Sequence, residues 1–260
     1  MSDSPAPYPP ENPAPDPWAG LKAHTAARIA LGRTGTSVPL REALAFRLAH
    51  AHARDAVYSG LEPATLLPAL LALRLPVCEV RSQAPDRQQY LQRPDLGRQL
   101  HEEARALLRD YRPHGFDLAI ILADGLSAAA VNAHAVPLLQ RLLPRLREAG
   151  FRLGPLVVAA QARVAIGDET GELLGAKLVL VLIGERPGLS SPRSLGAYFT
   201  YAPRPGLTDE VRNCVSNIRS EGLGYDLAAE RLLFLLREAL RRQLSGVHLK
   251  DDTRLLSSET

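Results

Sequence analysis

The chain has 260 residues, 46% of them hydrophobic, which is enough for one large α/β domain or for a domain with a smaller arm. No apolar run approaches the roughly 18 residues that a membrane-spanning helix needs, so we expect no membrane partner. Its 31 basic and 28 acidic residues give a net charge of +3 and are interspersed, which argues against a nucleic-acid partner.

The N-terminal segment carries no sign of a secretory signal, and we do not expect it to fold. It lacks the basic stretch followed by an apolar one that marks a secretory signal, and the two cysteines, Cys78 and Cys214, suit a reducing compartment. We therefore expect a cytoplasmic protein. Residues 1–17 are so rich in proline that they should be disordered or polyproline-like, with Trp18 as the first anchored residue.

A helical N-terminal region is predicted over residues 18–112. Its first helical stretch should run over residues 22–60, with Pro39 in a first-turn position and Gly60 as the stop. Steps of four, four and three residues place a set of apolar side chains on one face of this stretch: Leu40, Leu44, Leu48 and Ala51.

Two histidines and three shorter elements complete this region. His50 and His52 do not share a helix face, so we expect one buried and one exposed histidine rather than a metal pair. The remaining pattern predicts, in order, a short strand, a loop and a helix at residues 75–81, 90–95 and 98–111.

Residues 113–260 have the pattern of an α/β unit. Three apolar runs of strand length, at 118–123, 156–160 and 178–183, are typical of parallel strands buried on both faces. We expect a fourth strand at 197–201 and helices at 131–149, 169–174 and 228–244. The inward side of the last helix should carry Leu232, Leu235, Leu236, Ala239 and Leu240. The expected fold is α/β: a helical N-terminal region followed by a Rossmann-like, mostly parallel sheet covered by helices.

Ligands of an open parallel sheet bind beyond the carboxyl ends of its strands, and two loops lie there. One is Asp124-Gly125-Leu126-Ser127, and the other, residues 184–191, reads Gly-Glu-Arg-Pro-Gly-Leu-Ser-Ser. Glycines at 184 and 188 would let the backbone turn sharply and a ligand approach closely, and Glu185 would accept hydrogen bonds. The alternative for this loop is a tight turn with a surface ion pair.

The standard catalytic signatures are missing from the sequence. Gly222-Leu223-Gly224 lacks the third glycine of a dinucleotide loop, and Gly175-Ala176-Lys177 breaks the ending of a phosphate-binding P-loop. The chain has no G-x-S-x-G elbow, no H-E-x-x-H motif and no zinc-type spacing of histidines and cysteines. The residues thus indicate a ligand-binding α/β protein with no visible catalytic set, and each lone cysteine is by default an inert buried thiol.

Six strings, in the same order along the chain, resemble the small (light) subunit of ethanolamine ammonia-lyase, and the match runs from about residue 21 to residue 249. They are Arg93-Pro-Asp-Leu-Gly-Arg98, Ala123-Asp-Gly-Leu-Ser127, Leu174-Gly-Ala-Lys177, Ile183-Gly-Glu-Arg-Pro-Gly-Leu189, Tyr198-Phe-Thr-Tyr-Ala-Pro-Arg204 and Asn213-Cys-Val-Ser-Asn-Ile218. The combination of G-E-R-P-G-L with the later R-x-C-x-S-N-I, which begins at Arg212, is the most specific part.

The resemblance implies an adenosylcobalamin-dependent lyase that converts ethanolamine to acetaldehyde and ammonia, as a hetero-oligomer with a large subunit that carries the substrate pocket. Residues 113–260 would cover the cofactor from one side, without catalytic residues or metal ligands. The family's cobalamin contacts map onto Val164, Glu185 and Cys214. Val164 would make an apolar or backbone contact, and Glu185 would accept hydrogen bonds from amide or ribose groups. Cys214 would pack its soft sulfur against the nucleotide tail. The string D-x-H-x-x-G, which accompanies histidine ligation of cobalt, is absent.

One alternative remains for the location and two for the function. Some relatives have a longer N-terminal region that is associated with a bacterial microcompartment, although no amphipathic helix precedes Trp18 here. One alternative function is a stand-alone corrinoid or nucleotide binding module without a lyase partner. The other is a structural assembly protein in which the loop at 184–191 is only a turn.

Overall fold

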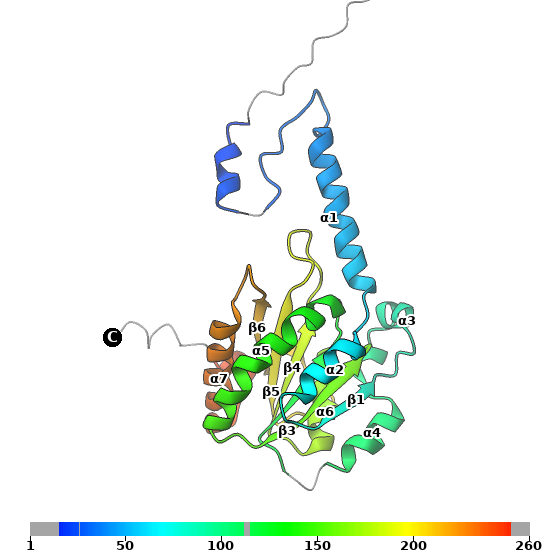
Figure 1. Cartoon of the computed structure of the whole chain (residues 1–260), viewed down its shortest axis with the longest axis vertical. Helices are drawn as coiled ribbons and strands as arrows, with labels where there is room; N and C mark the ends of the chain where they lie inside the picture. The colour runs from blue at the N-terminus through cyan, green and yellow to red at the C-terminus, as the bar shows by residue number, and fades with distance from the viewer. Residues whose placement is uncertain (1–15, 26, 112–114, 251–260) are drawn as a thin grey trace, which may run out of the picture.

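The computed structural model describes residues 16–25, 27–111 and 115–250, so nearly all of the proline-rich stretch at 1–17 lies outside the described residues. A six-stranded sheet forms the centre of the fold (Figure 1). Its strands are β1 (Val77–Arg81), β2 (Leu118–Ala123), β3 (Leu153–Ala160), β4 (Leu178–Gly184), β5 (Leu195–Tyr201) and β6 (Arg212–Ile218). The α-helices are α1 (Leu40–Tyr58), α2 (Pro63–Leu71), α3 (Arg87–Gln92), α4 (Glu102–Arg109), α5 (Ala128–Glu148), α6 (Ile166–Leu174) and α7 (Tyr225–Arg242). None of the helices in these ranges is long and apolar enough to cross a membrane.

The strands follow the order β1-β3-β2-β4-β5-β6 across the sheet. β1, β3, β2 and β4 are parallel to one another, whereas β5 is antiparallel to both of its neighbours. Only β5 therefore runs in reverse within this sheet, and the carboxyl ends of the other five strands lie at one edge. The predicted α/β class with a mostly parallel sheet is confirmed, while the Rossmann-like arrangement stays a prediction.

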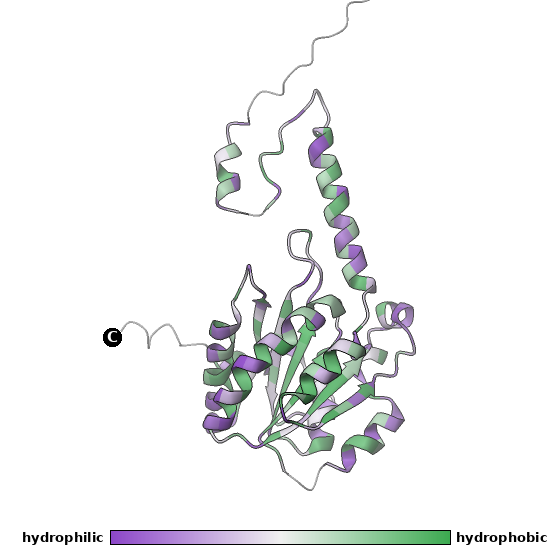
Figure 2. Cartoon of the chain, in the orientation of Figure 1, coloured by the Kyte–Doolittle hydropathy of each residue, from purple (hydrophilic) through white to green (hydrophobic). Residues whose placement is uncertain are grey.

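Helices cover both faces of the sheet because successive side chains of a strand point to opposite sides. On β2, Leu118, Ile120 and Leu122 belong to one apolar cluster, to which α2, α5 and α7 also contribute. The other three residues of β2, at positions 119, 121 and 123, belong to a second cluster, together with residues of α4 and α6. Every residue of β2 and β4 is buried, which confirms the prediction from their apolar runs. Figure 2 shows these strands as a hydrophobic centre.

β6 is the strand that the sequence pattern misses. Only Arg212, Val215 and Ile218 of its seven residues are buried, so no apolar run marks it. It lies at the edge of the sheet and pairs with β5, with Cys214 opposite Tyr198. An antiparallel edge strand with one covered face accepts polar residues at alternate positions, which hides it from a search for apolar runs.

Several predicted elements are present but begin earlier than predicted. α5, α6, α7 and β3 each start three residues before the predicted position, and β5 starts two residues before it. The first turn of a helix need not be apolar, so periodicity detects the helix one turn late. β1 comes from before residue 112 and pairs with β3 from after it. The domain boundary at 112 stays a prediction.

The predicted helical stretch over residues 22–60 is wrong in its first half. A short 3-10 helix, η1 (Ala19–Ala23), is followed by irregular chain in the described residues 24–25 and 27–38, and Pro39 caps α1 rather than lying in its first turn. Gly32 and Gly35 adopt φ angles of 72° and 61°, and this left-handed conformation interrupts a helix. α1 itself ends at Tyr58, just before the predicted stop at Gly60.

Three smaller predictions in this part of the chain also need correction. His50 and His52 are both exposed, since α1 packs against the domain only near its end. The predicted loop at 90–95 overlaps α3, because Asp86 Oδ1 accepts a hydrogen bond from Gln89 N at 2.8 Å and starts a helix there. The helix predicted from residue 98 begins only at Glu102, because the preceding residues pair with the end of β1.

Candidate functional site

Three loops meet at the edge where the parallel strands have their carboxyl ends. β2 lies between β3 and β4 and is parallel to both. Leu126 N donates to Gly184 O at 3.0 Å, and Ser127 Oγ donates to Pro192 O at 3.1 Å. The two predicted ligand loops are therefore in contact, and the loop after β3, which contains Val164, adjoins them.

The first of these loops uses its carboxylate for its own structure. Buried Asp124 accepts hydrogen bonds from the backbone N–H groups of Gln161 and Ala162, both at 2.8 Å, and of Gly125 at 3.0 Å. Arg87 Nη1 lies 3.5 Å from Asp124 Oδ2. Asp124 thus ties the loop after β2 to the loop after β3, and its oxygens are already occupied by these donors.

The glycines of the second loop act differently from the prediction. Neither Gly184 nor Gly188 has a positive φ, so neither makes a turn that only glycine could make. Gly184 is required for close packing within the chain, because a Cβ atom there would lie 2.0 Å from Ser127 O. The turn itself lies further on, where Gly188 and Ser191 exchange backbone hydrogen bonds of 3.1 and 3.2 Å.

Glu185 points its carboxylate over the start of β5 and keeps one oxygen free. Its Oε2 accepts hydrogen bonds from Ser194 Oγ and, at 3.4 Å, from Asn217 N. A Cβ atom on Gly196 would lie 3.0 Å from Glu185 Oε1, so the glycine makes room for the carboxylate. Within the described residues Oε1 accepts no hydrogen bond, and Glu185 and Arg186 form no ion pair. The half-buried carboxylate is therefore oriented by the protein and able to accept a further donor.

Cys214 and Tyr198 lie beside this carboxylate on the same face of the sheet. They are register partners on β6 and β5, and the Tyr198 hydroxyl hydrogen-bonds the thiol. Although Cys214 is exposed as a residue, partial desolvation raises the pKa of its thiol. The hydrogen bond with the Tyr198 hydroxyl lowers this pKa, and the charge of Glu185 raises it. A thiol with a raised pKa stays protonated at neutral pH and suits a packing contact rather than nucleophilic chemistry.

Val164 joins this face through an apolar cluster rather than through a polar contact. It lies in the turn before α6, where its carbonyl accepts a hydrogen bond from Gly167 N at 3.0 Å. Both Val164 and Tyr198 are partly buried against the cluster under α4 and α6. The structure thus brings Glu185 and Cys214 together around Tyr198 and places Val164 against the same cluster.

In the loops after β3 and β4, three buried polar atoms lack hydrogen-bond partners among the described residues. They are Gln161 Oε1, Arg163 Nε and Ser191 Oγ. Gln161 and Arg163 follow β3 directly, and Ser191 belongs to the loop after β4. Burying a polar atom without a partner is unfavourable, so these atoms favour a polar ligand at this edge.

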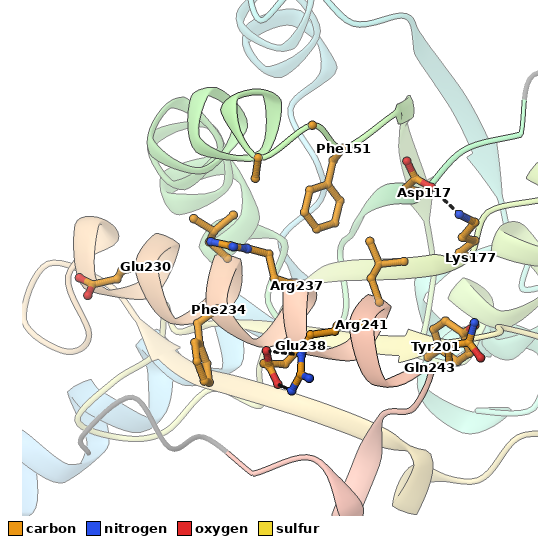
Figure 3. A pocket seen from close by; sticks show the side chains of 14 residues that line it. Asp117, Phe151, Lys177, Tyr201, Glu230, Phe234, Arg237, Glu238, Arg241 and Gln243 are labelled. Atoms are coloured by element: carbon orange, nitrogen blue, oxygen red, sulfur yellow. Dashed lines mark hydrogen bonds and ion pairs between the residues drawn. The ribbon is translucent and has the colours of Figure 1, made fainter. Parts of the chain in front are cut away.

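A separate hollow of about 1020 Å³ lies at the opposite edge of the sheet, beside α7. Figure 3 shows Phe151 and Phe234 at this hollow, with Lys177 directed at Asp117 and Arg241 at Glu238. These ion pairs are 3.0 and 2.6 Å long, so much of the lining charge is already compensated. Within the described ranges, no group of three or more histidine, cysteine, aspartate and glutamate side chains could hold a metal ion.

Sequence reasoning missed the residues that surround Glu185. Ser194, Gly196 and Asn217 orient or accommodate its carboxylate, and Tyr198 links it to Cys214. The available signal was Gly196, since a glycine inside a strand often marks a close approach by another group. Its meaning depends on a side chain eleven residues away, which no local pattern reveals.

Comparisons with known proteins identify the family of this chain. The family model described as ethanolamine ammonia-lyase light chain (EutC) matches residues 15–250. The ethanolamine ammonia-lyase small subunit of Pseudomonas syringae pv. tomato is 54% identical, over 100% of this chain and 92% of its own length. That of Azotobacter vinelandii is 58% identical, over 91% of this chain and 89% of its own length. This chain therefore belongs to the ethanolamine ammonia-lyase light chain family.

Proposed function

We propose that this chain is the small subunit of an adenosylcobalamin-dependent ethanolamine ammonia-lyase and holds the cofactor against the large subunit. The names of its relatives support the lyase role. The observation that carries the cofactor role is the carboxylate of Glu185, which is fixed through Oε2 and free at Oε1 beside Tyr198 and Cys214.

The residues at this edge fit the chemistry of a corrinoid. Its amide side chains and ribose hydroxyls would donate to Glu185 Oε1. Val164 and the protonated Cys214 would make apolar and weakly polar contacts. The three buried polar atoms without partners favour such a ligand, because a corrinoid carries both donors and acceptors around its rim.

In this proposal the chain binds and orients but does not react. When bound, adenosylcobalamin supplies a carbon-centred radical through homolysis of its cobalt–carbon bond, and the complex converts ethanolamine to acetaldehyde and ammonia. Val164, Glu185 and Cys214 hold one side of the cofactor and keep water from it. The substrate pocket and the groups that act on the substrate belong to the large subunit.

Replacing Glu185 by alanine should weaken cofactor retention in the assembled complex without unfolding the chain. A hydrogen bond to a charged acceptor contributes about 1.5–3 kcal/mol, so we expect a loss of affinity of about tenfold to a hundredfold. Equilibrium dialysis of the complex, followed by the absorbance of bound corrinoid, measures this loss.

Two further variants separate the role of Glu185 from a general effect of losing a charge. Glu185→Gln keeps an acceptor oxygen for Ser194 and should show an intermediate loss of affinity. Glu148→Ala removes an exposed carboxylate at the end of α5 and should bind the cofactor as the unmodified chain does. Unchanged corrinoid affinity in Glu185→Ala would remove this residue from the site.

The isolated chain should not deaminate ethanolamine, with or without added adenosylcobalamin. The measurement is acetaldehyde and ammonia release by the purified chain, compared with the same chain mixed with its large subunit. We expect product only in the mixture, because the reacting groups belong to the partner. Turnover by the chain alone would contradict the proposal, and tight corrinoid binding by the chain alone would favour a stand-alone binding module.

A further inference from the structure

We propose that residues 18–25 and 27–58 form a docking arm that binds the large subunit. This inference rests on the proposed function in one respect, the identity of the partner. In Figure 1 the arm extends away from the sheet, with α1 rising from the edge at which the candidate site lies. Of the 19 residues of α1, only Ala56 is buried.

The arm exposes an unusual amount of apolar surface. Twelve large hydrophobic side chains are exposed in the described ranges, and eight of them lie in the arm. These eight are Trp18, Leu21, Val38, Leu40, Leu44, Phe46, Leu48 and Tyr58. Such a concentration in so short a segment marks a surface that another protein covers.

The leucines of α1 form a stripe that is suited to a groove. Leu40, Leu44 and Leu48 follow one another at steps of four residues and are 74%, 53% and 58% exposed. Burying a leucine side chain contributes about 1.5–3 kcal/mol, so a partner that covers three of them gains considerable affinity. A helix that presents apolar residues at this spacing is typical of helix-in-groove recognition.

The position of the arm identifies its partner as the protein that covers the candidate site. The last turn of α1 and the loop after β4 share a hollow of about 370 Å³. Its lining includes Asp55, Ala56 and Ser59 from the arm's end and Pro192 and Arg193 from the loop. A large subunit that closes over the cofactor at this edge therefore lies directly beside α1.

The charge of the arm indicates the charge of the partner surface to which it binds. Residues 18–58 contain six basic and two acidic side chains, a net charge of +4, which exceeds that of the whole chain. Arg28 stacks on Phe46 at 5.5 Å, so one of these cations lies directly on the apolar surface. The complementary surface is an apolar groove with an acidic rim.

The test is the affinity of the full-length Leu44→Asp/Leu48→Asp variant for the purified large subunit, measured without cofactor. We expect it to bind at least about a hundredfold more weakly than the unmodified chain, since buried apolar anchors dominate interface affinity. Thermal unfolding of the variant alone should be unchanged, because both side chains are exposed. Leu107→Asp, a 41% exposed leucine on α4, is the matched control and should bind normally.

The possible outcomes test three claims separately: that the arm binds a partner, that this partner is the large subunit, and that the chain holds the cofactor. Unchanged affinity of the double variant overturns the inference and leaves the cofactor role intact. Loss of self-association with unchanged affinity for the large subunit would assign the arm to a second copy of this chain and also overturn it. Failure of the unmodified chain to bind the large subunit overturns both proposals. Excess double variant can be added until it saturates the large subunit. Normal corrinoid retention by that complex would support an arm that acts only in assembly.

Discussion

Replacing Gly184 by alanine is expected to lower the free energy of unfolding by about 3 kcal/mol, because overpacking against backbone atoms has no cheap relaxation. A Cβ atom at this position would lie 2.0 Å from the carbonyl oxygen and 2.5 Å from the carbonyl carbon of Ser127, and 2.8 Å from Asp124 O. All three atoms belong to the loop after β2. Chemical denaturation of the full-length chain, followed by circular dichroism, measures the change.

The same substitution should also weaken cofactor binding at the candidate site. Gly184 O accepts the hydrogen bond from Leu126 N that joins the two loops, and Glu185 is the next residue along the chain. Forcing the loops apart therefore moves the carboxylate that we propose as a cofactor contact. The Gly184→Ala complex should retain less corrinoid than its folded fraction alone would explain.

Gly188 is a control within the same loop. A Cβ atom there would have no neighbour closer than 3.8 Å, and its φ is not in the left-handed region. Gly188→Ala should change the free energy of unfolding by no more than about 0.5 kcal/mol, as surface substitutions usually do. Equal effects at 184 and 188 would show that the loop tolerates or rejects alanine for reasons unrelated to the contact with Ser127.

These two glycines illustrate what the sequence can and cannot predict. The apolar runs that became β2 and β4 predicted buried parallel strands, and the strand ends predicted which loops are candidates for ligand binding. Pattern alone treated Gly184 and Gly188 as equivalent flanks of a turn. Only the packing of the loop after β2 distinguishes them, and that contact joins segments some sixty residues apart.

The same limit applies to the candidate site and to α1. Glu185 stood out because it follows a strand, but Val164 and Cys214 were joined to it only by resemblance to a family. Cys214 lies on β6, an edge strand with no apolar run. On α1, periodicity predicted a shared face for Leu40, Leu44 and Leu48, which the helix has, but periodicity does not specify what covers that face. In this chain it is left exposed.

Removing one partner of the buried ion pair between Arg212 and Asp168 is the second large effect that we expect. Arg212 Nη1 and Nη2 lie 2.6 and 2.7 Å from Asp168 Oδ1 and Oδ2, and both side chains are only 3% exposed. Thr200 Oγ1 and Leu207 O accept further hydrogen bonds from the guanidinium group, at 3.2 and 3.1 Å. Arg212→Met should lower the free energy of unfolding by about 3–5 kcal/mol, because it leaves a buried carboxylate without its counter-charge.

The ion pair also joins α6, which follows Val164, to β6, which carries Cys214. Asp168 is on α6, four residues after Val164, and Arg212 is on β6, two residues before Cys214. The bidentate geometry therefore fixes α6 against β6 on the face that carries the candidate site. An Arg212→Met chain that still folds at low temperature should assemble with weakened corrinoid retention.

The pH dependence of the variant identifies the cause. In the intact protein burial raises the pKa of Asp168, although Arg212 opposes the shift, so without Arg212 the pKa should rise further. A carboxyl group whose pKa is higher in the folded than in the unfolded chain binds its proton more tightly when folded. The loss of stability of Arg212→Met relative to the unmodified chain should therefore be smallest below about pH 4, the pKa of an unfolded-state aspartate, and grow as the pH rises through the folded-state pKa of Asp168.

Asp209 supplies a comparison on the same guanidinium group. Its Oδ1 lies 3.2 Å from Arg212 Nε, but its side chain is 91% exposed. Exposed ion pairs contribute about 1 kcal/mol or less, so Asp209→Asn should have little effect on the free energy of unfolding. In Asp168→Leu/Arg212→Met both charges are gone, and most of the lost stability should return without the pH dependence. If Arg212→Met were as destabilised at pH 4 as at pH 8, lost packing rather than the unpaired charge of Asp168 would be responsible.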